Sequence, residues 1–94
     1  MSNLRFEWAP VKAKANLRKH RVSFEEATTV FLDERAIEFY DDTHSSWEDR
    51  MLILGLSSQL KLLLVCHCYR EEESLIRIIS ARKVTKNEAK LYQR

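Results

Sequence analysis

The sequence contains few residues that interrupt regular structure, with one glycine and one proline among its 94 residues. We therefore expect helices and strands joined by short loops. No apolar run approaches the roughly 20 residues that span a bilayer, and residues 1–14 lack the apolar stretch of a secretory signal. The length indicates one domain over residues 1–94, and these absences indicate a place in the cytoplasm and outside the membrane.

Cysteine is scarce, and Cys66 and Cys68 are the two that occur. They stand two positions apart in an apolar run, a spacing that disfavours a disulfide within one strand. Neither is joined by further ligands at metal-binding spacing, so the sequence predicts no metal site and no cofactor. We expect both to be small buried hydrophobic side chains.

Well-marked catalytic motifs are also missing, because the chain has no Gly-rich phosphate loop, no nucleophile elbow and no HExxH. Charge is abundant instead, and it is unevenly spread. Residues 1–22 hold six cations and one acid, residues 23–49 nine acids and one cation, and residues 50–94 nine cations and four acids. If the two basic segments meet in space, they form a surface that attracts a polyanion. The alternative is a set of solvated faces of alternating sign.

The first third of the chain predicts two helices after a short strand at residues 4–8. The helix at residues 10–20 begins with proline, which is well tolerated at a first helical position. Ser23 with Glu26 three residues later forms a capping box that opens a second helix. These two helices form an αα-hairpin. The first helix is expected to pack through Ala13, Leu17 and His20.

The rest of the chain predicts a β-meander and a short final helix. Gly55 stands inside one predicted strand and indicates a bulge or a close backbone approach. Thr85 and Glu88 repeat the capping-box spacing and open the last helix. The order β-α-α-β-β-β-β-α indicates an α+β fold. The four later strands are expected at 36–40, 50–57, 60–69 and 75–84.

The predicted strand at 60–69 has two faces by alternation. One face is apolar and ends in Cys66 and Cys68, and we expect it to be the core face. The other becomes more polar towards its end, where it carries His67 and Tyr69. These two residues suit either a functional site or a structural histidine beside an edge tyrosine.

The pairing of the last two strands decides which cation accompanies His67. If Tyr69 opposes Ile76, then Arg82 shares the face of His67, whereas a slip of one residue places Arg77 there. The charged connection between the strands does not decide between these registers.

Scattered histidine, glutamate and arginine side chains fit metal-free RNA cleavage. That reaction needs a base for the 2′-hydroxyl, cations for the phosphorane and an acid for the leaving oxygen. Arginine suits the phosphate contact, because its planar fork stays charged. Trp47, in a polar segment, is a candidate for stacking on a base.

Three stretches together resemble the BrnT family, toxins of type II toxin–antitoxin systems with a RelE-like fold. They are FEWAPVKAKANLRKHRVSFEEA, HSSWEDRMLILG and IRIISARKVTKNEAKLY, which together span most of residues 6–92. One departure is Arg21, which stands where the family usually has glycine after a Lys-His pair. A left-handed backbone there costs a non-glycine residue about 1 kcal/mol.

The resemblance implies a ribonuclease that arrests growth by cutting RNA. We expect it to be a metal-independent endoribonuclease that inhibits translation. The resemblance also implies an antitoxin similar to BrnA, with a ribbon-helix-helix part that binds operator DNA, and we expect a 2:2 heterotetramer. The alternatives are a non-catalytic binding module and a degenerate toxin that acts as an antitoxin-binding co-repressor.

The predicted site draws on the matching stretches and on the end of the long strand. We expect arginines to hold phosphate, and a histidine or Glu48 to move protons. The predicted catalytic residues are His67, Arg82, Arg50, Glu48 and His20. The predicted RNA-binding residues are Lys19, Tyr69, Arg70, Lys83 and Trp47.

Overall fold

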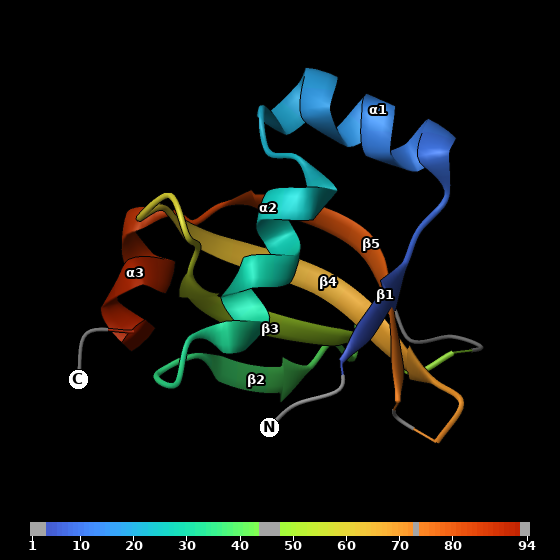
Figure 1. The fold of residues 1–94 in the computed structure, drawn as a ribbon. Helices are drawn as coiled ribbons and strands as arrows, with labels where there is room; N and C mark the ends of the chain where they lie inside the picture. The colour runs from blue at the N-terminus through green and yellow to red at the C-terminus, as the bar shows by residue number, and fades with distance from the viewer. Residues whose placement is uncertain (1–3, 44–47, 73, 93–94) are drawn as a thin grey trace.

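The computed structural model describes residues 4–43, 48–72 and 74–92. Within these residues, three α-helices and a 3₁₀ turn accompany one five-stranded mixed sheet (Figure 1), which confirms the α+β class. The strands are β1 (Arg5–Glu7), β2 (Ile37–Tyr40), β3 (Met51–Leu56), β4 (Leu62–Arg70) and β5 (Leu75–Lys83). The helical segments are α1 (Pro10–His20), α2 (Phe24–Thr29), η1 (Val30–Leu32) and α3 (Lys86–Tyr92). Among the described residues, no helix is long and apolar enough to cross a membrane.

The strands lie in the order β1-β5-β4-β3-β2. Strands β2 to β5 are antiparallel neighbours in chain order, as short connections allow. Strand β1 pairs in parallel with the first half of β5, and the chain between them contains the helices. The first and last parts of the sequence therefore meet at one edge of the sheet.

Both helices predicted near the N-terminus form, and one end of each is capped in an unusual way. Helix α1 ends at Arg21, whose φ of 61° is left-handed and whose N–H donates to the carbonyl of Leu17. An arginine thus adopts the conformation for which glycine is usual. Ser23 caps α2 by accepting from the N–H of Glu26. The Glu26 carboxylate does not complete the box but accepts from the hydroxyl of Ser57 at 2.6 Å.

Helices α1 and α2 cover one face of the sheet, as Figure 1 shows for α2. The residues of this core cluster are Val22, Phe24, Ala27, Val30, Ile53, Leu63, Val65, Ile76, Ile78 and Ala81. The sheet residues among them alternate with Cys66 and Cys68, which are buried on the opposite face. The prediction that Cys66 and Cys68 lie on a buried face is confirmed, but the opposite face is covered by the helices and is buried too. Both faces of β4 are apolar, so alternation alone did not distinguish them.

Helix α1 buries Asn16 instead of the predicted Leu17, which is 48% exposed. The Asn16 side-chain amide donates to the carbonyls of Val22 and Ala81 at 2.9 Å and accepts from the N–H of Ala81 at 3.1 Å. It thereby pairs with the part of β5 beyond β1, where a leucine would leave backbone groups unsatisfied.

Gly55 lies where the β3 backbone approaches other segments closely, as expected from its position within a strand. A Cβ atom built on it would stand 2.9 Å from the Cβ of Ala36 and 2.9 Å from Cγ1 of Val30. Glycine thus allows η1 and the turn before β2 to pack directly on the sheet.

Candidate active site on the open face of the sheet

A β-bulge between β4 and β5 decides which side chains share a face. Tyr69 does oppose Ile76, but Cys66 opposes Ser80, so β5 has one residue more than β4 in this interval. A bulge of this kind interrupts the alternation of side chains. As a result, Arg77 opposes Cys68 and Arg82 opposes Leu64.

Both β5 arginines therefore lie on the cysteine face, and neither lies with His67. The expected alternative, in which one of them accompanies His67, was wrong because it assumed an unbroken strand. We call the sheet face turned away from α1 and α2 the arginine face. Its arginines are Arg50, Arg70, Arg77 and Arg82.

His67 is fully buried on the helix-covered face. Its Nε2 lies 2.7 Å from Oε2 of Glu38, and its Nδ1 lies 3.1 Å from the carbonyl of Val65. Since a carbonyl only accepts, Nδ1 carries a hydrogen. The Tyr69 hydroxyl donates to the same Glu38 oxygen at 2.5 Å, and the Phe31 ring packs against the imidazole with centroids 4.8 Å apart.

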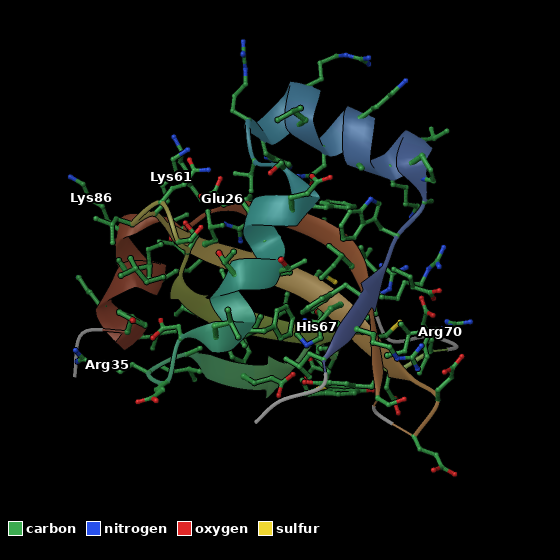
Figure 2. All side chains as sticks on the ribbon, in the orientation of Figure 1. Glu26, Arg35, Lys61, His67, Arg70 and Lys86 are labelled. Atoms are coloured by element: carbon green, nitrogen blue, oxygen red, sulfur yellow. The ribbon has the colours of Figure 1, made fainter. Side chains whose placement is uncertain are left out.

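This network links β2 and β4, and His67 is its fully buried member, so the imidazole does not present its ring to an RNA in this conformation. Figure 2 shows His67 in the interior and Arg70 at the far end of the sheet. The prediction that His67 lies on a face accessible to RNA was therefore wrong, because the helices cover that face. Tyr69 is half-buried and borders an open hollow that Arg70 also lines.

Glu48 lies between two arginines of the arginine face. Its Oε2 is 3.5 Å from Nε of Arg50, and its Oε1 is 3.9 Å from Nη1 of Arg70. The Cys68 thiol points at the same carboxylate at 3.7 Å. The side chains of Glu48 and Arg70 are 36% and 49% exposed, so they can also reach a ligand. They line a hollow of about 680 Å³ at the end of β4.

Arg82 is held at the other end of the face by the last helix. Its Nη1 and Nη2 donate to the two carboxylate oxygens of Glu88 at 2.9 and 2.8 Å. Glu88 also completes the predicted capping box with Thr85. The Arg82 guanidinium and these hydrogen bonds lower the pKa of Glu88 to about 2. A second hollow, of about 550 Å³, has both Arg50 and Arg82 in its wall.

The other predicted residues are more dispersed. Lys19 and His20 lie at the end of α1, where they border a shallow hollow with Ser80 near the bulge. Lys83 opposes Leu63 and is exposed, so it does not lie on the arginine face. Trp47 lies outside the described residues, so its predicted stacking role stays a prediction.

The cysteines have no acidic thiol. Burial raises the pKa of the Cys66 thiol to about 11, and burial also raises that of Cys68. Both are free cysteines. They are neutral near pH 7 and supply apolar contacts, in agreement with the sequence.

Sequence reasoning placed Arg77 only in an alternative register, and it did not single out Glu7. Glu7 Oε2 lies 3.1 Å from Nη1 of Arg77 and 3.5 Å from Nε of Arg70. The chain of contacts thus continues from Arg50 across β4 and β5 to β1. The only available clue was the odd spacing of Arg77 and Arg82, which requires a bulge if both share a face.

Comparisons with known proteins agree with this fold. The family model of the ribonuclease toxin BrnT of type II toxin–antitoxin systems matches residues 8–88. The 1.1 Å crystal structure of the ribonuclease toxin BrnT from Brucella abortus superposes with a TM-score of 0.68. The match covers 88% of this chain and 99% of that chain at 18% sequence identity, and it shows likeness of fold. A search of curated proteins found no match.

Proposed function

Because the chain belongs to the BrnT family of ribonuclease toxins of type II toxin–antitoxin systems, we propose that its arginine face cleaves RNA with Glu48 as the base. The observation that carries this proposal is the position of the Glu48 carboxylate between Arg50 and Arg70. A base beside two cations is what attack on a phosphodiester requires. The side chains of Glu48 and Arg70 line an open hollow that an RNA strand can enter.

In the proposed reaction, Glu48 takes the proton of the 2′-hydroxyl, and the 2′-oxygen attacks the neighbouring phosphorus. The bond to the 5′-oxygen breaks, and that oxygen takes a proton from water. The hydroxide that is left takes the proton from Glu48, which restores the carboxylate. The products are a 2′,3′-cyclic phosphate and a 5′-hydroxyl end. Arg50 and Arg70 stabilise the charge of the phosphorane, and Arg82 contacts the strand across the second hollow.

We further propose that no metal takes part, because the guanidinium groups can neutralise the phosphorane themselves. Lys19 and His20 then contact the strand at the edge of β5, where they border Ser80. Tyr69 lies at the rim of the first hollow and can stack on a base there.

The first prediction is that Glu48→Gln lowers kcat for RNA cleavage in EDTA by about 10²–10⁴-fold, the range for loss of a general base. Cleavage of a labelled RNA by purified, folded protein is the measurement. Glu34→Gln is a matched control, since Glu34 is an exposed carboxylate before β2. Full activity of Glu48→Gln would move the base elsewhere, and loss of wild-type activity in EDTA would contradict metal independence.

A non-catalytic binding module is the alternative, and one observation favours it. Arg70 and Arg77 contact Glu7, and Arg82 contacts Glu88, so the face is already an ion-pair network of the chain itself. Such a network can serve stability and partner binding alone. Tight RNA or antitoxin binding by wild-type protein without any cleavage would favour this alternative.

The family implies an antitoxin partner. We propose that it is a BrnA-like protein with a ribbon-helix-helix part, that the complex is a 2:2 heterotetramer, and that the antitoxin binds operator DNA. The mass of the co-expressed complex by light scattering tests the stoichiometry. A shift of operator DNA by the complex, and none by the toxin alone, tests the DNA-binding role.

A further inference from the structure

We propose that Arg77 forms a second phosphate-binding subsite, so that the RNA strand crosses the sheet from β3 towards β1. The inference rests on the proposed function, and it adds a path for the substrate. The ligand is a phosphodiester beside the one that is cleaved.

The first argument is the row in which the residues stand. Arg77 opposes Cys68 on β4 and Glu7 on β1. The register of β3 and β4 pairs Met51 with His67, so its continuation by one residue brings Arg50 beside Cys68. Arg50 and Arg77 thus flank β4 on the same face, two strand spacings or roughly 10 Å apart.

The second argument is that contacts link this row to the proposed reaction centre. Glu7 accepts from Arg77 at 3.1 Å and lies 3.5 Å from Nε of Arg70. A shared carboxylate allows two guanidinium groups to stay close together despite their like charge. Arg70 in turn lies 3.9 Å from Glu48. A strand whose reacting phosphate sits at Arg70 therefore has its next cation at Arg77.

The third argument is access. The Arg77 side chain is 37% exposed, and its hydrogen bond to Glu7 uses one nitrogen of a fork that carries five donors. Arginine can keep such an ion pair and still contact a phosphate oxygen. A solely structural role, in which Arg77 joins β5 to β1, predicts no effect on RNA binding.

The experiment measures equilibrium binding of a 2′-O-methylated RNA strand, which cannot be cleaved, over a range of salt concentrations. Loss of one phosphate contact reduces the slope of log K against log salt by about 0.7 for a single strand. We expect this change for Arg77→Gln, together with about tenfold weaker binding at low salt. Arg18→Gln is the matched control, because Arg18 is exposed on α1 on the other side of the sheet. It should bind as the wild type does.

Arg50→Gln separates failure of the inference from failure of the proposed function. If Arg50→Gln reduces the slope and folded Arg77→Gln does not, the subsite is wrong and the proposed face stands. If neither variant alters binding, both are wrong. Should Arg77→Gln fail to fold, Arg77→Lys keeps the charge and loses the fork. Weaker binding with an unchanged slope then supports the subsite, and wild-type affinity overturns it.

Discussion

At the scale of single residues, His67 shows how a side chain of catalytic type can serve the interior. It contacts Glu38 and the Val65 carbonyl and lies edge-on to two aromatic rings. Both ring nitrogens of His67 have partners and the ring is fully buried, so this side chain links strands. The sequence predicted correctly that His67 and Tyr69 share a face. It could not predict that the helices cover that face, because the opposite face of β4 is apolar too.

His67→Gln is therefore expected to destabilise the protein and to leave kcat for RNA cleavage within about twofold of the wild type. The Val65 carbonyl, which is buried, loses a hydrogen-bond donor, at a cost of roughly 1–3 kcal/mol, and the Glu38 carboxylate loses a second contact. Urea unfolding gives the stability, and cleavage per folded molecule gives kcat. A large fall in kcat at wild-type stability would return His67 to the reaction.

At the scale of secondary-structure elements, a strand and a side chain cover different parts of the edge of β5. Strand β1 pairs with residues 75–77, and the Asn16 side chain of α1 pairs with Ala81. The helix and strand boundaries were largely predictable from capping residues and periodicity. The bulge and the amide pairing were not, because both depend on which segments meet after folding.

Asn16→Ala should lower the free energy of unfolding by about 3 kcal/mol, since backbone groups of Val22 and Ala81 lose their partner. Chemical denaturation measures the change. Lys14→Ala, at an exposed position of the same helix, should change stability by less than about 0.5 kcal/mol. Equal stability of both variants would mean that water replaces the amide without cost.

At the scale of the whole molecule, the charged segments take separate roles. The exposed cations of α1 lie on the helix side, and the arginines of the later strands lie on the opposite face. The two basic segments approach each other at the edge of β5, where Lys19 and His20 of α1 border Ser80. Several acids of the middle segment bind other side chains or backbone groups of the protein. Glu38 binds His67, and Asp33 binds Tyr92 and the Leu56 N–H.

Stability should fall below about pH 4.5 and continue to fall towards pH 2, because anchoring carboxylates have depressed pKa values in the folded state. The pKa of Glu88 is about 2 against an ordinary 4.5. Burial alone would raise the pKa of Asp33, but hydrogen bonds from Leu56 and Tyr92 outweigh it and lower the value below 3.8. The unfolded chain binds these protons first, so acid favours unfolding.

Denaturant unfolding across this pH range measures the effect, with Glu88→Gln as the comparison. The variant should be less stable than the wild type at neutral pH, and the gap should shrink as pH falls from about 4.5 to about 2. A gap that stays constant over that range would show that the Arg82–Glu88 pair does not contribute through its charge.

The bulge in β5 determines which sequence spacing places two side chains on the same face of the sheet in relatives of this chain. On an unbroken strand, side chains that share a face are separated by an even number of positions. Arg77 and Arg82 are five positions apart and share a face, so the count is odd across the bulge. A homologue that lacks one residue here would need its cations at an even spacing to build the same surface. Alignments that ignore this shift would match a proposed RNA contact with a core residue.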